Sequence, residues 1–433
     1  MNVLLIMQDA LRPDRLGCYG HTKNTSPFID ELAREGVRFE TVVSVSSHTF
    51  PGVVSLMTGQ WTATHNLMTA ADYGRWMAAP PIANTPLRSI AQAGWNVDGQ
   101  GVYRWAPLGF DRDTEDVAEY LRRRQNRPFF FLAEPYSTHL PYDPPAQYYE
   151  FFRDPQFRAD ADCERRLQLV RTRMILHPPG VKSKFEVGQA DTIGGGDEAH
   201  QRSAIEVEFQ PEDRPGIRAL YDGEVRVFDD QVAAWFATLE KAGTLDDTLI
   251  AITADHGEEL LERGQIGHSS CNLHGTLFDE CIRIPLIIWR PGSLPSGVVV
   301  RQQISQIDIL PTICAAIGAP FPQGADGSSA LSLMRGETHS FRAEAFAQTL
   351  PAGWQALEGD HREIWCLRTS EWKLIAHTGA GREPRYELYH LASDPDERED
   401  VYRGSTQRIT ALRDRLDREI ERDAHSRARR HAV

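Results

Sequence analysis

The segment Leu249–Gly257, with the sequence LIAITADHG, decides the fold of this chain. Its continuous apolar run is typical of a strand buried on both faces of a parallel sheet. An aspartate and a histidine, Asp255 and His256, follow the run directly, and a glycine that suits a turn comes next. Ligands of open parallel sheets collect outside the carboxyl ends of the strands. We therefore expect Asp255 and His256 to lie at a functional edge of the sheet.

Two further apolar runs have the same form. The sequence VLLIMQD at 3–9 places Asp9 where a buried strand would end, and FFFLA at 129–133 predicts a third strand. Helical patterns alternate with these runs, as in the helix that should begin at Pro27 and stop at Gly36. This alternation predicts an α/β fold with a doubly wound, mostly parallel sheet flanked by helices.

The length of 433 residues suits one large domain and a smaller one. We expect residues 1–343 to form the α/β catalytic domain. Residues 344–433 should form a small antiparallel sheet and a closing amphipathic helix from near Thr406. Periodicity breaks down over residues 154–215, which we interpret as an irregular insertion or as a lid over the site.

The segment SHTFPGVVSLMTG at 47–59 offers a nucleophile. Thr49 stands just ahead of Pro51, and proline is favoured in the first turn of a helix, where unpaired N–H groups attract anions. Taken alone, Thr49 is more simply a helix cap. The two strand ends that carry Asp9 and Asp255 favour the catalytic interpretation.

Asp9, Asp255 and His256 could converge at one edge of the sheet, with Thr49 beside them. Two carboxylates, an imidazole and an alkoxide oxygen suit Zn²⁺ or Mn²⁺, and the histidine argues against a pure calcium cage. We expect one or two divalent ions per chain, with Ca²⁺ or Mg²⁺ as alternatives to Zn²⁺ or Mn²⁺.

Several other segments recur in a recognisable order. They are DALRPDRLGCYG at 9–20, SPFIDELAREGVRF at 26–39, LFDECIRIPLII at 277–288, RTSEWKLI at 368–375, YELY at 386–389 and DPDE at 394–397. Together they resemble the sulfatase branch of the alkaline phosphatase superfamily over most of the chain. The resemblance implies a metal-dependent enzyme with a sulfatase-like fold and a small C-terminal subdomain.

The departures from that family pattern bear on the chemistry. Sulfatases share a Cys or Ser, any residue, Pro, any residue and Arg, and their first residue becomes formylglycine. Here Thr49 takes the first position and Val53 the last, and Ala10 follows Asp9 where the family has a second Asp. Threonine cannot become an aldehyde. Thr49 therefore resembles the nucleophile of the phosphodiesterase, nucleotide pyrophosphatase and phosphoethanolamine-transferase branches.

A threonine nucleophile favours phosphorus over sulfur. A metal ion can activate the hydroxyl, and a phosphothreonine ester can be hydrolysed in line with metal assistance. A threonine sulfate cannot collapse as the formylglycine hemiacetal does. We therefore predict a hydrolase of phosphoric diesters or phosphonate esters. The alternatives are a sulfuric-ester hydrolase without formylglycine, a transferase of the phospho group on the same scaffold and a non-enzymatic binding protein.

Three histidines could complete the site. His139 lies just past the third apolar run, where the resemblance implies an anion-contacting histidine, and His268 and His274 lie in GHSSCNLH at 267–274. His274 falls about where sulfatases place a lysine that contacts the sulfate. We expect His139 and His274 to act in catalysis, and all three to bind the transferred group, protonate the leaving oxygen or hold a second ion. A structural role for each histidine is the competing interpretation, and a metal role for Cys271 is the weaker interpretation of that thiol.

Composition limits the partners. The net charge of -14 argues against a nucleic-acid platform, which leaves a small anionic ester as the expected partner. No run of about 18 apolar residues predicts a membrane span. Without a visible leader we expect a cytoplasmic protein, whose six scattered cysteines are free thiols. The oligomeric state stays open.

Overall fold

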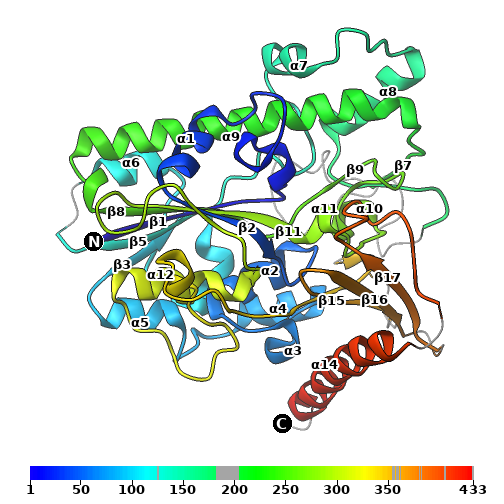
Figure 1. Cartoon of the computed structure of the whole chain (residues 1–433). Coiled ribbons are helices and arrows are strands. Elements are labelled where there is room, and N and C mark those ends of the chain that lie inside the picture. Colours follow the sequence, from blue (N-terminus) through cyan, green and yellow to red (C-terminus); the bar gives the residue numbers. More distant parts are fainter. Residues whose placement is uncertain are drawn as a thin grey trace.

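The computed structural model describes residues 1–123, 126–181, 204–353, 356, 360, 362–379, 381, 383–403 and 406–431. Within these ranges a nine-stranded sheet forms the centre of the molecule (Figure 1). Its strands are β1 (Asn2–Gln8), β2 (Val37–Val43), β3 (Asn96–Gly99), β4 (Arg112–Asp113), β5 (Phe129–Ala133), β8 (Thr248–Ala254), β11 (Arg283–Trp289), β12 (Val298–Val300) and β13 (Ile304–Ser305). All residues of β1, β5 and β8 are buried, as the continuous apolar runs predict.

The sheet is mostly parallel, as predicted. Its order is β12-β2-β11-β8-β1-β5-β3-β4, with β13 paired to β2. Strand β1 runs parallel to both β5 and β8, so that Gln8 and Ala254 are partners at the carboxyl ends of β1 and β8. Strand β11 is the exception, because it runs antiparallel to both β8 and β2.

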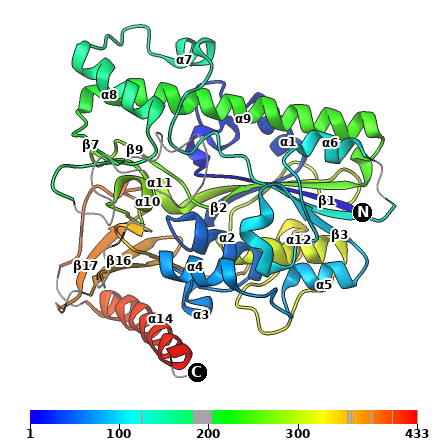
Figure 2. The ribbon, with the colours of Figure 1, turned by 180° about the vertical axis from the view of Figure 1, so that it is seen from behind.

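Helices cover both faces of the sheet (Figures 1 and 2). On one face lie α1 (Pro27–Glu35), α6 (Val117–Arg122) and the long α9 (Arg214–Ala242); on the other lie α2 (Thr49–Thr58), α5 (Pro86–Gln92) and α12 (Ile309–Ile317). Gly36 ends α1, as predicted. The carboxylate of Asp229 in α9 accepts the backbone N–H groups of Phe28 and Ile29 at 3.1 and 2.8 Å, which fixes the start of α1.

A second sheet follows in the C-terminal part of the chain. Strands β14 (Ala345–Thr349), β15 (Glu363–Arg368), β16 (Trp372–Thr378) and β17 (Arg385–His390) pair antiparallel in sequence order. Helix α14 (Gln407–His431) packs on this sheet through Ile409, Leu412 and Leu416. The predicted small antiparallel sheet and closing helix are therefore present, and the exact division at 343/344 stays a prediction.

The segment 154–215 is more regular than its sequence indicates. Asp160 caps helix α8 (Ala161–Thr172) by accepting the N–H of Cys163, and the short strands β6 (Leu176–His177) and β7 (Ile205–Glu206) pair with each other. Helix α9 begins at Arg214. The predicted irregular part within 182–203 lies outside the described residues, so the choice between insertion and lid stays a prediction.

Shorter elements complete the chain. They are α3 (Thr62–His65), α4 (Ala70–Ala78), α7 (Ala146–Phe152), α10 (Ser269–Asn272), α11 (Asp279–Ile282), α13 (Leu331–Met334), β9 (Glu259–Leu260) and β10 (Ile266–Gly267). In the described part of the chain, no helix combines the length and the apolarity that crossing a membrane requires. All six cysteines fall within the described ranges, and each is a free thiol, as predicted.

Candidate metal and nucleophile site

Adjacent strands bring the predicted acidic residues together. Asp9 follows β1, and Asp255 follows β8, so the parallel register of these two strands carries both carboxylates to the same edge of the sheet. The backbone N–H of Ala10 donates to Asp255 Oδ1 at 3.0 Å. Ala10 has a φ of 57°, a left-handed conformation that costs a residue with a Cβ some energy. The chain holds this turn next to the two carboxylates.

Thr49 is the first residue of α2, and its hydroxyl points to the same edge. Its Oγ1 lies 3.2 Å from His256 Nε2. The N-cap position belongs to His48, so the interpretation of Thr49 as a helix cap is wrong. A Cβ on Gly52 would lie 3.0 Å from the backbone oxygen of Asp255. The glycine thus lets α2 approach the end of β8, and this approach positions the hydroxyl.

His256 is the centre of this group. Its Nε2 lies 3.4 Å from Asp255 Oδ2 and 3.8 Å from Asp9 Oδ1. Its Nδ1 lies 2.8 Å from the carbonyl oxygen of Gly257. Because a carbonyl only accepts hydrogen bonds, Nδ1 carries a proton, and Nε2 is the nitrogen that faces the carboxylates and Thr49.

The four groups have the character of a cation site. Asp9 Oδ1 and Asp255 Oδ2 are buried and have no hydrogen-bond partner among the described residues. Burial raises the pKa of Asp9 well above its usual range, and the neighbouring Asp255 charge raises it further. Bonds of about 2.0–2.2 Å to zinc would separate tetrahedral ligand atoms by about 3.4 Å. The distances of 3.2, 3.4 and 3.8 Å from His256 Nε2 fit that spacing.

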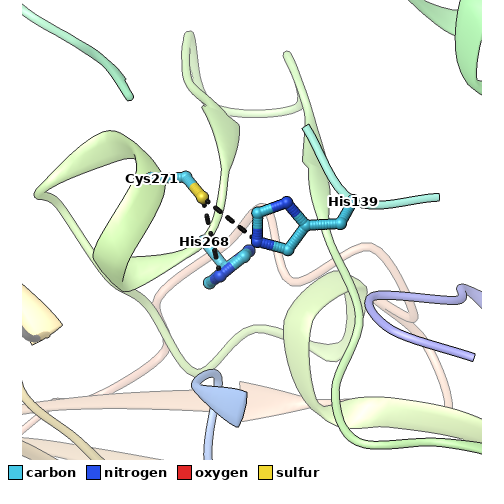
Figure 3. A group of neighbouring side chains, drawn as sticks. All are labelled: His139, His268 and Cys271. Atoms are coloured by element: carbon cyan, nitrogen blue, oxygen red, sulfur yellow. Dashed lines mark hydrogen bonds between the residues drawn. The ribbon is translucent and has the colours of Figure 1, made fainter. Parts of the chain in front are cut away.

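Two of the three predicted histidines lie together, with a cysteine as third member (Figure 3). His139 follows β5, His268 lies between β10 and α10, and Cys271 belongs to α10. Cys271 Sγ lies 3.6 Å from His139 Nε2 and 3.6 Å from His268 Nε2. The rings of His268 and His256 have centroids 4.3 Å apart. This second group is therefore a neighbour of the first.

His274 has different surroundings. Its side chain is exposed, and its backbone N–H donates to Asn272 Oδ1 at 2.9 Å. Partial burial lowers the pKa of His274, and so do the charges of Arg362 and His377 from the C-terminal sheet. His274 therefore lies on the side of the site that faces the C-terminal sheet, apart from His139 and His268. The catalytic role expected for His274 stays a prediction.

Sequence reasoning missed Arg104. It lies in a 3-10 helix, Val102–Leu108, that begins three residues after β3. Its Nη2 donates to Glu134 Oε2 at 2.9 Å, and Trp105 Nε1 donates to Glu134 Oε1 at 2.7 Å. The guanidinium is 38% exposed, and its charge acts on Asp9 to lower the pKa of that carboxyl. Arg104 is therefore a fixed cation beside the site, within reach of solvent. Arg104 lies beyond the turn that follows β3, so the strand-end rule that found Asp9 does not find it.

The C-terminal sheet forms hydrogen bonds with the loop that precedes Thr49. The backbone N–H of Gln348 in β14 donates to the carbonyl oxygen of Val45 at 2.8 Å. Ser47 Oγ donates to Thr349 Oγ1 at 3.1 Å, and Ser269 Oγ donates to the carbonyl oxygen of Ser47 at 3.1 Å. The loop before Thr49 is thus held from two sides, by β14 and by α10, the helix that carries Cys271.

Comparisons with known proteins bear on the family and on the fold. The family model described as Sulfatase matches residues 1–98 and 103–319, and the model described as N-sulphoglucosamine sulphohydrolase, C-terminal, matches residues 274–425. Human arylsulfatase A is 23% identical over 92% of this chain and 82% of its own. The multifunctional alkaline phosphatase superfamily protein PehA of Trinickia caryophylli is 25% identical, over 79% of each chain. The crystal structure of the phosphonate monoester hydrolase of Agrobacterium radiobacter matches with a TM-score of 0.73 and 20% identity, over 98% of this chain and 96% of that one.

Proposed function

The chain belongs to the sulfatase family, and from that premise we propose that it is a metal-dependent hydrolase of phosphoric diesters or phosphonate esters, with Thr49 as its nucleophile. The family and the fold make it an enzyme of the sulfatase and alkaline phosphatase superfamily. The substrate class is our inference from the chemistry of a threonine at this position. Relatives named for sulfate esters and for phosphonate esters are both found on this fold.

The observation that carries the proposal is the position of the Thr49 hydroxyl. It lies 3.2 Å from His256 Nε2, at the edge where the unpartnered oxygens of Asp9 and Asp255 also lie. Asp9, Thr49, Asp255 and His256 are the residues that would hold the metal ion. A divalent ion bound there would supply a Lewis acid, which lowers the pKa of the threonine hydroxyl.

The proposed reaction is a double displacement at phosphorus. Thr49 Oγ1 attacks the phosphorus, so that an O–P bond forms, the bond to the leaving oxygen breaks, and a phosphothreonine ester results. Water attacks the same phosphorus from the side opposite the threonine oxygen and releases Thr49. In the first displacement the Thr49 hydroxyl loses its proton and the leaving oxygen gains one; in the second the attacking water loses a proton and Thr49 Oγ1 gains one. We assign this proton transfer to His274, because Nδ1 of His139 lies 2.5 Å from the carbonyl oxygen of Leu140 and Nε2 of His139 faces Cys271.

Binding of the anionic ester needs positive charge and hydrogen-bond donors. Arg104 supplies a guanidinium that Glu134 holds at 2.9 Å. We assign it to an oxygen of the substrate, because bidentate donors from arginine match phosphoryl oxygens well. His274 stays assigned to the transferred group. A small-molecule ester fits this proposal, and no nucleic-acid platform is needed.

The experiment that tests the proposal is a comparison of matched aryl esters. The purified protein, loaded with Zn²⁺ or Mn²⁺, is assayed with an aryl phosphate diester, an aryl phosphonate ester, an aryl phosphate monoester and an aryl sulfate that share one leaving group. We expect the largest kcat/KM with the diester or the phosphonate. A chelator should abolish that activity, and the same metal should restore it.

Two outcomes would contradict the proposal. Faster cleavage of the aryl sulfate would assign the protein to sulfuric-ester hydrolysis without formylglycine. A product that carries the phospho group on an added alcohol or amine, in excess over the hydrolysis product, would assign it to group transfer. The Thr49→Val variant serves as the blank in every assay, since it keeps the shape of the side chain and lacks the hydroxyl.

A further inference from the structure

We infer that His139, His268 and Cys271 form a second metal site, selective for zinc, in which the thiolate is the anionic ligand. The three ligand atoms lie within 4.8 Å of one another. Two nitrogens and one sulfur, from the segment after β5 and from the start of α10, point toward one space in Figure 3. This inference does not depend on which ester the enzyme cleaves.

The distances between the ligand atoms match zinc coordination. Cys271 Sγ lies 3.6 Å from each of the two Nε2 atoms. Zinc binds thiolate sulfur at about 2.3 Å and imidazole nitrogen at about 2.0–2.1 Å, so the tetrahedral angle separates the two atoms by about 3.6 Å.

The second nitrogen of each ring is held as metal-binding histidines require. His139 Nδ1 lies 2.5 Å from the carbonyl oxygen of Leu140, and His268 Nδ1 lies 3.3 Å from Glu258 Oε1. Each Nδ1–H can donate to its oxygen, which fixes the tautomer and turns Nε2 toward the sulfur. His256 in the first group uses a backbone carbonyl, that of Gly257, in the same way.

Burial favours a tightly held ion over a solvated one. His268 is 1% exposed and Cys271 is 3% exposed, and Glu258 behind them is completely buried. When zinc binds, the thiol of Cys271 releases its proton to solvent, and both imidazoles keep theirs on Nδ1. Soft sulfur favours Zn²⁺ over Mn²⁺, Mg²⁺ and Ca²⁺. The second site therefore selects a softer ion than the oxygen-rich first group does.

The same local geometry explains why Cys271 takes the place that His274 has in the sequence-based expectation. His268 is the N-cap residue of α10, and the backbone N–H of Cys271 donates to its carbonyl oxygen at 2.8 Å, so this turn brings the two residues together. Leu273 then adopts a φ of 58° and ends α10. The chain turns before residue 274, which leaves the His274 side chain exposed.

Metal content of the intact chain is the first test. Protein expressed with added zinc is purified, and zinc per chain is measured for wild type, Cys271→Ala and Cys314→Ala. Cys314 is equally buried but lies in α12, so its variant controls for loss of a core thiol. We expect Cys271→Ala to hold one zinc ion fewer than wild type, and Cys314→Ala to hold as many as wild type. An unchanged zinc content in Cys271→Ala would overturn the inference.

A spectrum of the wild-type chain provides the second test and needs no variant to fold. Protein grown with cobalt in place of zinc should show a near-ultraviolet sulfur-to-cobalt charge-transfer band. The band should persist in Cys314→Ala. A cobalt-loaded wild type without that band would show that the thiol is not a ligand, even if the phosphodiesterase activity of the protein were established. Loss of the ester activity alone would instead contradict the proposed function and leave the band intact.

Discussion

Two buried clusters of carboxylates in this molecule have opposite electrostatics. Where the C-terminal sheet meets the main sheet, Asp279 is bound by Arg368 Nη2 at 2.7 Å and by Lys373 Nζ at 2.9 Å. Burial alone would raise the pKa of Asp279, but the charges of Arg368 and Lys373 outweigh it and hold that pKa far below the usual range. At the ends of β1 and β8, burial and the charge of Asp255 hold the pKa of Asp9 well above its usual range.

The difference teaches how to separate structural carboxylates from functional ones. The first cluster contains its own cations, so it is complete as folded and stabilises the junction of the two sheets. In the cluster at the ends of β1 and β8, one oxygen of Asp9 and one of Asp255 have no hydrogen-bond partner among the described residues. Arg104, whose charge lowers the pKa of Asp9, is itself bound to Glu134. Such a cluster is suited to receive a cation from solution.

The largest expected effect concerns Thr49, the proposed nucleophile beside Asp9 and Asp255. Thr49→Val should lower kcat by roughly 10⁴–10⁶-fold, as removal of a catalytic nucleophile does in hydrolases. The fold should persist, because valine preserves the shape and the hydroxyl contacts only His256 Nε2 in the described contacts. Thermal unfolding and steady-state kinetics measure the two quantities. A kcat within tenfold of wild type would remove Thr49 from the mechanism.

The next effect concerns Asp279 and the two cations that bind it, Arg368 and Lys373. Asp279→Asn should lower the free energy of unfolding by about 3–5 kcal/mol, because it leaves the charges of Arg368 and Lys373 buried with less compensation. The kcat of the remaining folded protein should change little. Denaturant unfolding and kinetics on the same sample measure both. A stable but inactive variant would contradict the structural assignment of this cluster.

That stability contribution should also depend on pH. The folded pKa of Asp279 lies below its unfolded value, so the carboxylate stabilises the fold above about pH 4 and loses this effect as the pH falls further. The difference in unfolding free energy between wild type and Asp279→Asn should therefore be constant from pH 7 to pH 5 and shrink below pH 4. A difference that grows on acidification would have the wrong sign.

A smaller effect should follow from loss of the exposed cation beside the second cluster. Arg104→Ala should lower kcat/KM by roughly 10²–10³-fold, the usual loss for a donor that stabilises developing charge. The matched control is Arg123→Ala, since Arg123 is exposed on the surface and pairs with Glu119. A loss confined to stability would show that Arg104 only anchors Glu134.

The smallest expected effect is a pH dependence of the unfolding free energy that comes from Asp9 and has the opposite sign to that of Asp279. Because its folded pKa is raised, the protonated form stabilises the metal-free fold, and this stability is lost as the pH rises through the folded pKa. In chelator, wild type should become more stable relative to Asp9→Asn as the pH falls from neutral. Added zinc should remove the trend. A trend that is the same with and without zinc would argue that no ion binds at Asp9.

The sequence predicts the second cluster better than its surroundings. Asp9 and Asp255 each follow an apolar run, and parallel pairing brings such strand ends together whatever the loops do. Arg104 escapes this rule because a turn separates it from β3. The antiparallel direction of β11 could not be predicted either, because an apolar run has the same pattern whichever way the strand runs.

The histidines show a different limit. Their clustering in the sequence predicts a shared site, but the left-handed φ of Leu273, a residue with no turn signature, exposes His274. The spacing of three residues between His268 and Cys271 was the available signal for the group that the structure brings together with His139. Side-chain direction after an irregular turn depends on tertiary packing, which local sequence does not encode.

Trapping the covalent intermediate tests the central claim most directly. Wild-type protein is mixed with an aryl phosphonate or an aryl phosphate diester, quenched in acid during turnover and digested for mass spectrometry. We predict that the peptide containing residues 47–59 carries the mass of the transferred phosphoryl or phosphonyl group on Thr49, and that Thr49→Val carries none. The same group on another residue, or its appearance in Thr49→Val, would contradict the account.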